Sequence, residues 1–239
     1  MSSQYQSVLS PSLYPDAFQV AAPVPLPQRN VWPRQQGVFI RRVTPLAAEP
    51  AGEPMSGSMG GLAAEPAPTP GKGLRELVAG QFGFVPHWVK SASDARLRAT
   101  KLVNARSETV STSTQFRDAW LKGQRCIVPM MAFIEDDWRS GKAVPTRIAR
   151  IDGKPMGAAG LWEVWSKDGE QIVSFTLLTV SANSHALLHR YQQDGNEKRM
   201  PAILGEGAHD AWLDARPEKA REFMRAYPAT SLTANPVEK

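Results

Sequence analysis

Short apolar runs, each bounded by turn residues, are the main pattern along this chain and predict β-strands. The runs are rich in Val, Ile, Leu, Phe and Trp, and they end at Gly or Pro or at an Asp-Gly pair, as the strands of a packed sheet do. The Asp152-Gly153 pair predicts a hairpin turn. The predicted strands cover residues 37–43, 77–85, 126–129, 146–151, 156–162 and 172–180.

Helical spacing of apolar residues is confined to four segments. In residues 114–122, Thr114 is placed to cap a helix whose inner face carries Phe116, Ala119 and Trp120. The other predicted helices cover residues 183–190, 207–214 and 217–226. Because strands outnumber helices and are joined mostly by short turns, we predict an α+β fold with a largely antiparallel, curved, barrel-like sheet system and flanking helices.

Residues 45–73 lack this periodicity. The stretch from Pro45 to Ala51 is nearly repeated by the stretch from Gly61 to Ala67, and both are rich in Pro, Gly and Ala. Such a segment cannot build a packed element. We predict a flexible surface loop inserted between two strands of a single domain that spans residues 1–239, and we expect its removal to leave the fold intact.

The composition is that of an ordinary globular protein, with 239 residues, 42% hydrophobic and 21% charged. The apolar runs are too short to span a membrane and the N-terminus has no signal-peptide pattern, so we expect a cytoplasmic protein with no membrane partner. The single cysteine, Cys126, excludes an internal disulfide and a cysteine-rich metal site. We expect Cys126 to be a small buried residue, and we expect no metal and no cofactor.

The charge balance permits a polyanionic partner. The chain has 28 Lys and Arg against 23 Asp and Glu, a net charge of +5, and phosphate groups bind such proteins by releasing counterions. Many basic proteins bind no nucleic acid, so the charge alone does not choose this function. No Ser-His-Asp set identifies a protease independently.

Three polar motifs are more specific than the composition. They are Asn104-Ala105-Arg106-Ser107-Glu108-Thr109, the stretch from Arg125 through Pro129 to Glu135, and Glu197-Lys198-Arg199-Met200-Pro201. Together and in this order they resemble the SOS-response-associated peptidase (SRAP) family, whose members capture abasic sites in single-stranded DNA. The resemblance covers nearly the whole chain apart from residues 45–73. It implies a domain that binds single-stranded or abasic DNA, and we expect it to be a monomer.

The resemblance directs attention to the N-terminus. Methionine is usually removed before a small residue, so we expect the mature chain to begin with the amine of Ser2. About a tenth or more of an α-amino group is neutral at pH 7, which makes it a ready nucleophile toward an aldehyde. The family has a cysteine here, whose thiol closes a stable thiazolidine, whereas a serine ring is more easily reversed. The alternatives are an ordinary solvated terminus and a serine that replaces a natural cysteine.

Three further catalytic residues are implied by the resemblance. Glu135 follows Pro129 at the spacing of the family's catalytic glutamate and is the acid/base candidate; the alternative is a surface glutamate at a strand end. Asn104 is expected to orient the opened sugar, or else to sit in a turn beside a structural Arg-Glu pair. Gln192 stands at the place we assign to the family's histidine and cannot exchange a proton near pH 7. We therefore expect impaired crosslinking.

The resemblance also implies a set of DNA contacts. The expected roles are a phosphate grip by a guanidinium, stacking of a base on an aromatic ring, and a phosphate track of basic side chains. The residues are Arg106 for the grip, Trp88 for the stacking, Lys198 and Arg199 for the track, and Asn30 and Pro33 from an Asn-x-x-Pro turn near the site. The alternatives are a core tryptophan and a solvated charge pair. The rival hypothesis for the whole chain is a non-catalytic, phage-derived DNA-binding or regulatory module.

Overall fold

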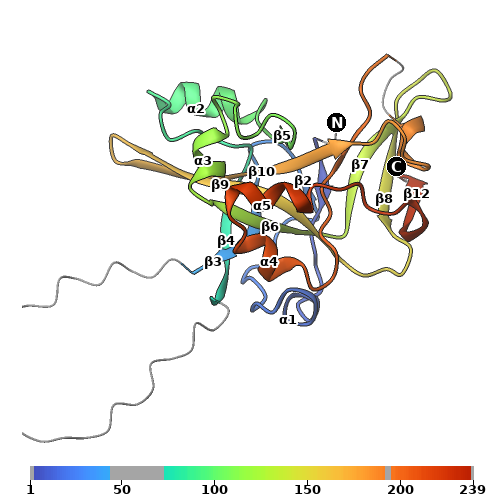
Figure 1. Cartoon of the computed structure of the whole chain (residues 1–239), viewed down its shortest axis with the longest axis horizontal. Helices are drawn as coiled ribbons and strands as arrows, with labels where there is room; N and C mark the ends of the chain where they lie inside the picture. Colours follow the sequence, from blue (N-terminus) through green and yellow to red (C-terminus); the bar gives the residue numbers. More distant parts are fainter. Residues whose placement is uncertain (1–2, 44–72, 192–194, 238–239) are drawn as a thin grey trace, which may run out of the picture.

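A closed β-barrel forms the centre of the computed structural model, which describes residues 3–43, 73–191 and 195–237 (Figure 1). Neighbouring barrel strands pair in the order β4-β3-β6-β9-β10, and β10 pairs back with β4. Every pairing is antiparallel except the parallel one between β10 and β4. The strands are β3 (Gln36–Arg42), β4 (Arg75–Phe82), β6 (Arg125–Met130), β9 (Met156–Lys167) and β10 (Glu170–Ser181).

A second, wholly antiparallel sheet lies beside the barrel, at the side of the molecule where Figure 1 marks the chain ends. Its order is β12-β8-β7-β1-β2. Only Met131 separates β6 from β7, so the chain passes directly from the barrel into the second sheet. The strands are β1 (Tyr5–Gln6), β2 (Asn30–Val31), β7 (Ala132–Asp137), β8 (Val144–Arg150) and β12 (Leu232–Pro236).

Two short strands flank the C-terminal half of β10. β5 (Asn104–Arg106) runs parallel to it and places Arg106 opposite Thr179. β11 (Arg199–Pro201) runs antiparallel on the other edge and places Arg199 opposite Ser181. Two motifs that are far apart in the sequence are therefore brought to the same end of β10.

Aromatic packing fastens the N-terminal strand to the barrel. Tyr5, Phe82 and Phe175 are each at most 1% exposed, and the Tyr5 ring meets Phe82 edge-on with a centroid distance of 5.2 Å. Such a pair contributes about 0.5–1.5 kcal/mol beyond its buried area. Strand β1 is thus held in place by the core.

Short helices cover the barrel. The Trp120 ring of α3 lies 6.4 Å from the Trp212 ring of α4, and the Arg125 guanidinium stacks on both rings. The α-helices are α1 (Leu13–Phe18), α2 (Ala92–Ala99), α3 (Arg117–Leu121), α4 (His209–Leu213) and α5 (Pro217–Ala220), with 3-10 turns at Leu188–Arg190, Arg221–Phe223 and Ala229–Ser231. No helix in the described ranges is long and apolar enough to cross a membrane.

The predicted fold class is confirmed, and each predicted strand is present with shifted ends. Asp152-Gly153 does form a turn, with Gly153 at φ 71°. It is not a hairpin turn, because β8 and β9 belong to different sheets. Cys126 is fully buried as predicted, and burial raises the pKa of its thiol well above the usual value.

The helix predictions were less accurate. Thr114 does not cap α3, which begins two residues later than expected and has no side-chain cap. Residues 183–190 contain only the 3-10 turn Leu188–Arg190. The sequence pattern also missed α1 and α2; the buried face of α2 consists only of Ala95 and Ala99, while Leu97 is exposed, so no apolar stripe marks it.

The predicted loop at 45–73 lies outside the described residues apart from Gly73, but the strands on both sides of it are paired. The Val43 N–H donates to the Leu74 carbonyl at 2.8 Å, so replacing residues 44–73 by Asn-Gly leaves a two-residue connection between paired positions. Each halving of the loop length lowers the entropic cost of closing the loop by only about 0.6 kcal/mol. We expect thermal melts to show unchanged or slightly higher stability; a loss above about 2 kcal/mol would contradict a dispensable loop.

Candidate active site

A cavity of about 520 Å³ opens between the second sheet and the short strands β5 and β11. Its walls come from the N-terminal segment, from β7 and the turn after it, and from the two motifs beside β10. The lining residues are Ser3, Gln4, Trp32, Arg106, Ile134, Glu135, Asp136, Trp138, Pro145, Asn196, Glu197 and Arg199.

Backbone pairing leads the N-terminal segment into this cavity. β1 pairs with β7 so that Tyr5 lies opposite Phe133, and the Ile134 N–H donates to the Gln4 carbonyl at 3.1 Å. Continued by two residues, this register brings Ser3 opposite Glu135, and both residues line the cavity. Ser2 lies outside the described residues, one peptide bond upstream of Ser3.

Glu135 is a buried cavity residue. It is only 4% exposed and lies on β7, which is paired on both sides, by β1 and by β8. The alternative of a surface glutamate is therefore wrong. A carboxyl group shielded from water at the cavity wall is suited to proton transfer with a reacting group in the cavity.

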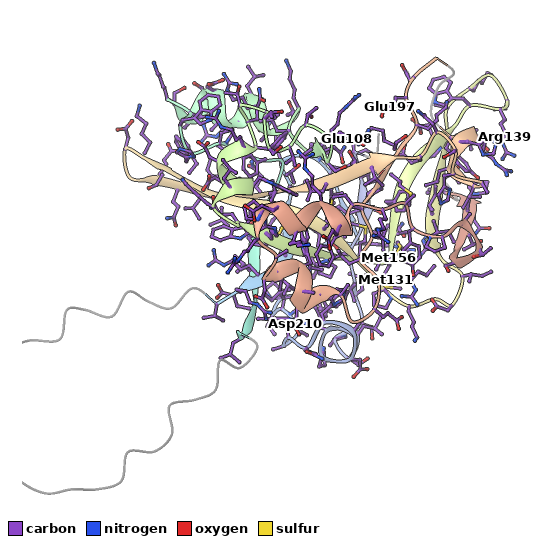
Figure 2. The ribbon with its side chains drawn as sticks, viewed as in Figure 1. Glu108, Met131, Arg139, Met156, Glu197 and Asp210 are labelled. Carbon is purple, nitrogen blue, oxygen red and sulfur yellow. The ribbon has the colours of Figure 1, made fainter. Side chains whose placement is uncertain are left out.

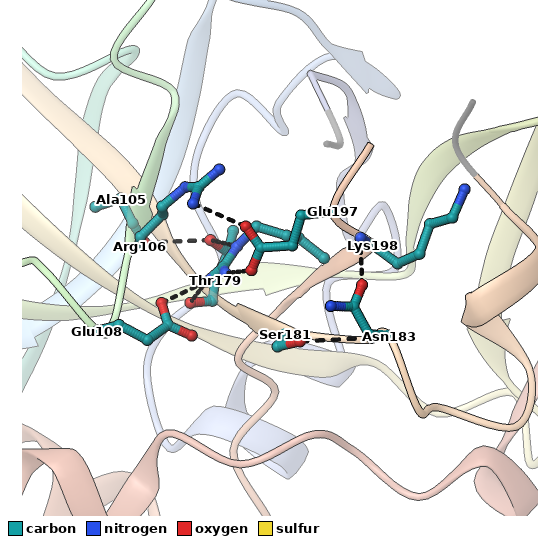
Figure 3. A network of polar contacts seen from close by, with 9 residues as sticks. Ala105, Arg106, Glu108, Thr179, Ser181, Asn183, Glu197 and Lys198 are labelled. Atoms are coloured by element: carbon teal, nitrogen blue, oxygen red, sulfur yellow. Dashed lines mark hydrogen bonds and ion pairs between the residues drawn. The ribbon is translucent and has the colours of Figure 1, made fainter. Parts of the chain in front are cut away.

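The opposite wall carries an alternating row of charges (Figure 3). Arg106 forms an ion pair with Glu197, with 2.7 Å between Nη1 and Oε2. The other carboxylate oxygen of Glu197 accepts from Arg199 Nη1 at 2.5 Å. Arg199 Nη2 donates in turn to Glu108 Oε2 at 2.7 Å. Glu197 therefore links an exposed arginine to a buried one.

Arg199 is the centre of this network. Its side chain is 1% exposed, and besides the two carboxylates it donates to both the hydroxyl and the carbonyl oxygen of Thr179. Burial opposes ionisation of Glu108, but the hydrogen bond and charge of Arg199 outweigh it and lower the pKa of Glu108. A buried guanidinium between two carboxylates is neutralised locally and rigid.

The structure separates the predicted DNA contacts into two groups. Arg106 and Arg199 line the cavity. Asn30 and Pro33 belong to the same short segment as Trp32, which also lines the cavity. Arg199 is buried, so the alternative of a solvated charge pair is wrong for it.

Lys198 and Trp88 are not among the cavity lining. The Lys198 side chain extends away from the Glu197 network in Figure 3. Trp88 is 37% exposed, so it is not a core residue; its indole donates to the Thr114 carbonyl and Arg98 stacks on its ring. These two contacts stay predictions.

Asn104 lies in β5 rather than in a turn. It is two residues before Arg106 on the same strand, so both side chains lie on one face, but Asn104 is not part of the cavity lining. Gln192 lies outside the described residues. Neither role is tested by the geometry.

Sequence reasoning missed Glu197 and the two aromatic residues Trp32 and Trp138. Glu197 is the first residue of its motif, and Trp32 lies inside the Asn-x-x-Pro turn. The motif and the turn could therefore have pointed to these two residues. Trp138 follows two aspartates and had no such signal.

None of the four histidines is in the cavity lining. His185 is buried, with Nε2 against the Tyr227 carbonyl at 2.7 Å and Nδ1 accepting from two backbone N–H groups. His189 Nδ1 meets the His185 carbonyl. These two are structural. Within residues 3–43, 73–191 and 195–237, no group of three His, Cys, Asp or Glu is arranged to hold a metal ion.

A sequence model described as SOS response associated peptidase (SRAP) matches residues 1–239. The chain belongs to this family. A solved protein structure from Bordetella bronchiseptica has a TM-score of 0.81 and 37% identity, and the match covers 99% of this chain and all of the other.

Curated relatives are named as abasic site processing proteins. HMCES of Gallus gallus is 30% identical over 68% of this chain and 53% of its own length. YoaM of Bacillus subtilis is 29% identical over 64% of this chain and 65% of its own length. The matched part of this SRAP chain thus spans about half to two thirds of those relatives.

Proposed function

We propose that this SRAP protein binds single-stranded DNA containing an abasic site and reacts with its aldehyde through the N-terminal amine of Ser2. The observation that carries the proposal is the pairing of β1 with β7, which brings Ser3, the residue after Ser2, into the cavity beside buried Glu135. The names of the curated relatives support the substrate class.

The chemistry is an ordinary condensation. The neutral Ser2 amine adds to the aldehyde carbon of the ring-opened sugar to give a carbinolamine. Glu135 donates a proton to the departing hydroxyl, which leaves as water, and recovers a proton from the nitrogen as the imine forms. Over the two steps the C=N double bond of the imine replaces the C=O double bond of the aldehyde and one water is released, so no oxidant or cofactor is consumed.

The other polar groups have supporting roles. Asn104 orients the opened sugar through its amide, and Gln192 provides hydrogen bonds without exchanging a proton. The Ser2 hydroxyl has no accessible anion near neutral pH, so closure to an oxazolidine does not trap the imine. The adduct is therefore reversible.

DNA affinity is the primary test. Fluorescence anisotropy is expected to show binding of single-stranded DNA with little sequence preference and steep weakening with salt. Arg106→Ala removes one guanidinium at the cavity and is expected to weaken binding of all sequences by roughly three- to tenfold and to reduce the salt slope by about 0.7.

Arg96→Ala is the matched control, because Arg96 is an exposed, ion-paired arginine on α2 outside the cavity. Equal losses of DNA affinity for both variants would show that Arg106 acts only through the net charge of the protein. No binding by the unmodified protein at low salt would refute the proposed function. The rival non-catalytic module predicts normal binding without any adduct that borohydride can trap.

A further inference from the structure

A second hollow, of about 250 Å³, lies on the same sheet as the cavity. Its walls include Gln6 and Ser7 from the N-terminal segment, Met131 between β6 and β7, and the two arginines Arg29 and Arg147. Met131 and the cavity residue Glu197 are both labelled in Figure 2 and lie well apart in that view. The described residues that line the hollow and those that line the cavity have none in common, so the hollow is a feature separate from the cavity.

The two arginines are the notable feature of this hollow. Every ion pair that the structure gives lies elsewhere, so among the described residues neither Arg29 nor Arg147 has a carboxylate within 4 Å. Burial lowers the pKa of Arg147, and the positive charge of Arg29 lowers it further. Two guanidinium groups that repel each other across an open hollow are arranged for an anion between them.

A neutral hydroxyl group and a chain of hydrogen bonds complete the hollow. Ser7 is 2% exposed, and its hydroxyl has no hydrogen-bond partner among the described residues. Arg147 Nε donates to Gln6 Oε1 at 2.8 Å, and Gln6 Nε2 donates to Asn30 Oδ1 at 3.3 Å. This chain of hydrogen bonds joins β8, β1 and β2 and fixes Arg147 while its remaining N–H groups stay available.

The hollow and the cavity border the same extended N-terminal segment. Gln4 lines the cavity and Gln6 lines the hollow. Because Gln4 and Gln6 are two residues apart on an extended segment, their side chains lie on the same face, about 7 Å from each other. A strand of nucleic acid bound in the cavity thus has a direct path to the hollow.

We propose that Arg29, Arg147 and Ser7 form a phosphate site that holds a backbone phosphate of the DNA strand leaving the cavity. This inference rests on the proposed function and extends it, since it adds a contact outside the reacting centre. A free phosphate ion offers the same chemistry to these three groups. The continuous path from Gln4 to Gln6 favours the DNA backbone as the source.

The test compares the unmodified protein with the double variant Arg29→Ala/Arg147→Ala on single-stranded oligonucleotides from a trinucleotide to a dodecamer. On the shortest, which fill only the cavity, both proteins are expected to bind alike. On longer ones the double variant is expected to bind about tenfold more weakly, with a salt slope smaller by about 0.7 because one phosphate contact is lost. Arg29→Lys/Arg147→Lys keeps both charges and should restore most of the slope.

Controls separate the outcomes. Thermal melts must show that the double variant is folded, and Arg96→Ala again controls for net charge. Equal affinity and equal salt slope at every length would overturn the inference while leaving the proposed function intact. Inorganic phosphate that stabilises the unmodified protein but not the double variant, with DNA binding unchanged, would also overturn it by identifying a free-anion site. Failure of the unmodified protein to bind DNA would instead refute the proposed function.

Discussion

The variant Ser2→Cys is expected to form a heat-stable crosslink with abasic single-stranded DNA, whereas the unmodified chain is expected to give only an adduct that borohydride must trap. Once Met1 is removed, both proteins carry a terminal amine one residue before Ser3, which lines the cavity. A cysteine thiol has a reference pKa of about 8.5, so a few per cent is thiolate at pH 7, and the thiolate closes the ring on the imine. The serine hydroxyl offers no comparable nucleophile.

The measurement is a denaturing gel after heating, with and without borohydride, preceded by a mass spectrum that shows Met1 removed. We expect at least a tenfold larger heat-stable fraction for Ser2→Cys. Gln192→His and Glu197→His are then added to that variant one at a time. The substitution that raises the crosslinking rate identifies the position from which a proton can be transferred; Glu197 is included because it lines the cavity. A heat-stable adduct from the serine protein without reductant would show that a thiol is not required; absence of any adduct from all variants would favour the non-catalytic module.

The variant Arg199→Met is expected to cause the largest loss of stability. Arg199 is 1% exposed and binds Glu197, Glu108 and Thr179. Removing the cation leaves Glu108 without this partner and Glu197 with Arg106 alone, and it removes the buried hydrogen bonds to Thr179. Because both carboxylates are partly exposed, we expect a loss of about 2–3 kcal/mol, below the cost of an uncompensated buried charge. For a chain of this size we expect the melting temperature to fall by roughly 4–12 °C.

The pH dependence of that loss is a second readout. The pKa of Glu108 is lowered in the folded protein by Arg199, so its stabilisation is present above the ordinary value of 4.5 and disappears as the pH falls through the lowered pKa. The deficit of Arg199→Met is therefore expected to be largest near neutral pH and to shrink in acid. Arg96→Met, in an exposed ion pair, should change stability by less than about 1 kcal/mol. A similar effect of both variants would show that the burial of Arg199 contributes nothing.

Local pattern accounts for much of this fold. The six apolar runs became strands because period-two patterning and turn residues act over a few neighbours. The order of the polar motifs was enough to indicate the family, which the match over residues 1–239 confirms. Short helices such as α2 escaped because packing, rather than an apolar stripe of their own, stabilises them.

Pairing between distant segments decided the rest. Nothing near Asp152 in the sequence tells that β8 and β9 enter different sheets. Glu135 in its acidic surroundings reads as a surface residue, and only its place between two paired strands buries it. The sequence by itself determined the strands, the motifs and the candidate amine at Ser2. Only the tertiary structure joined Arg106 to Glu197 and Arg199, because β5 and β11 are far apart in the sequence and come close only by pairing with the two edges of β10.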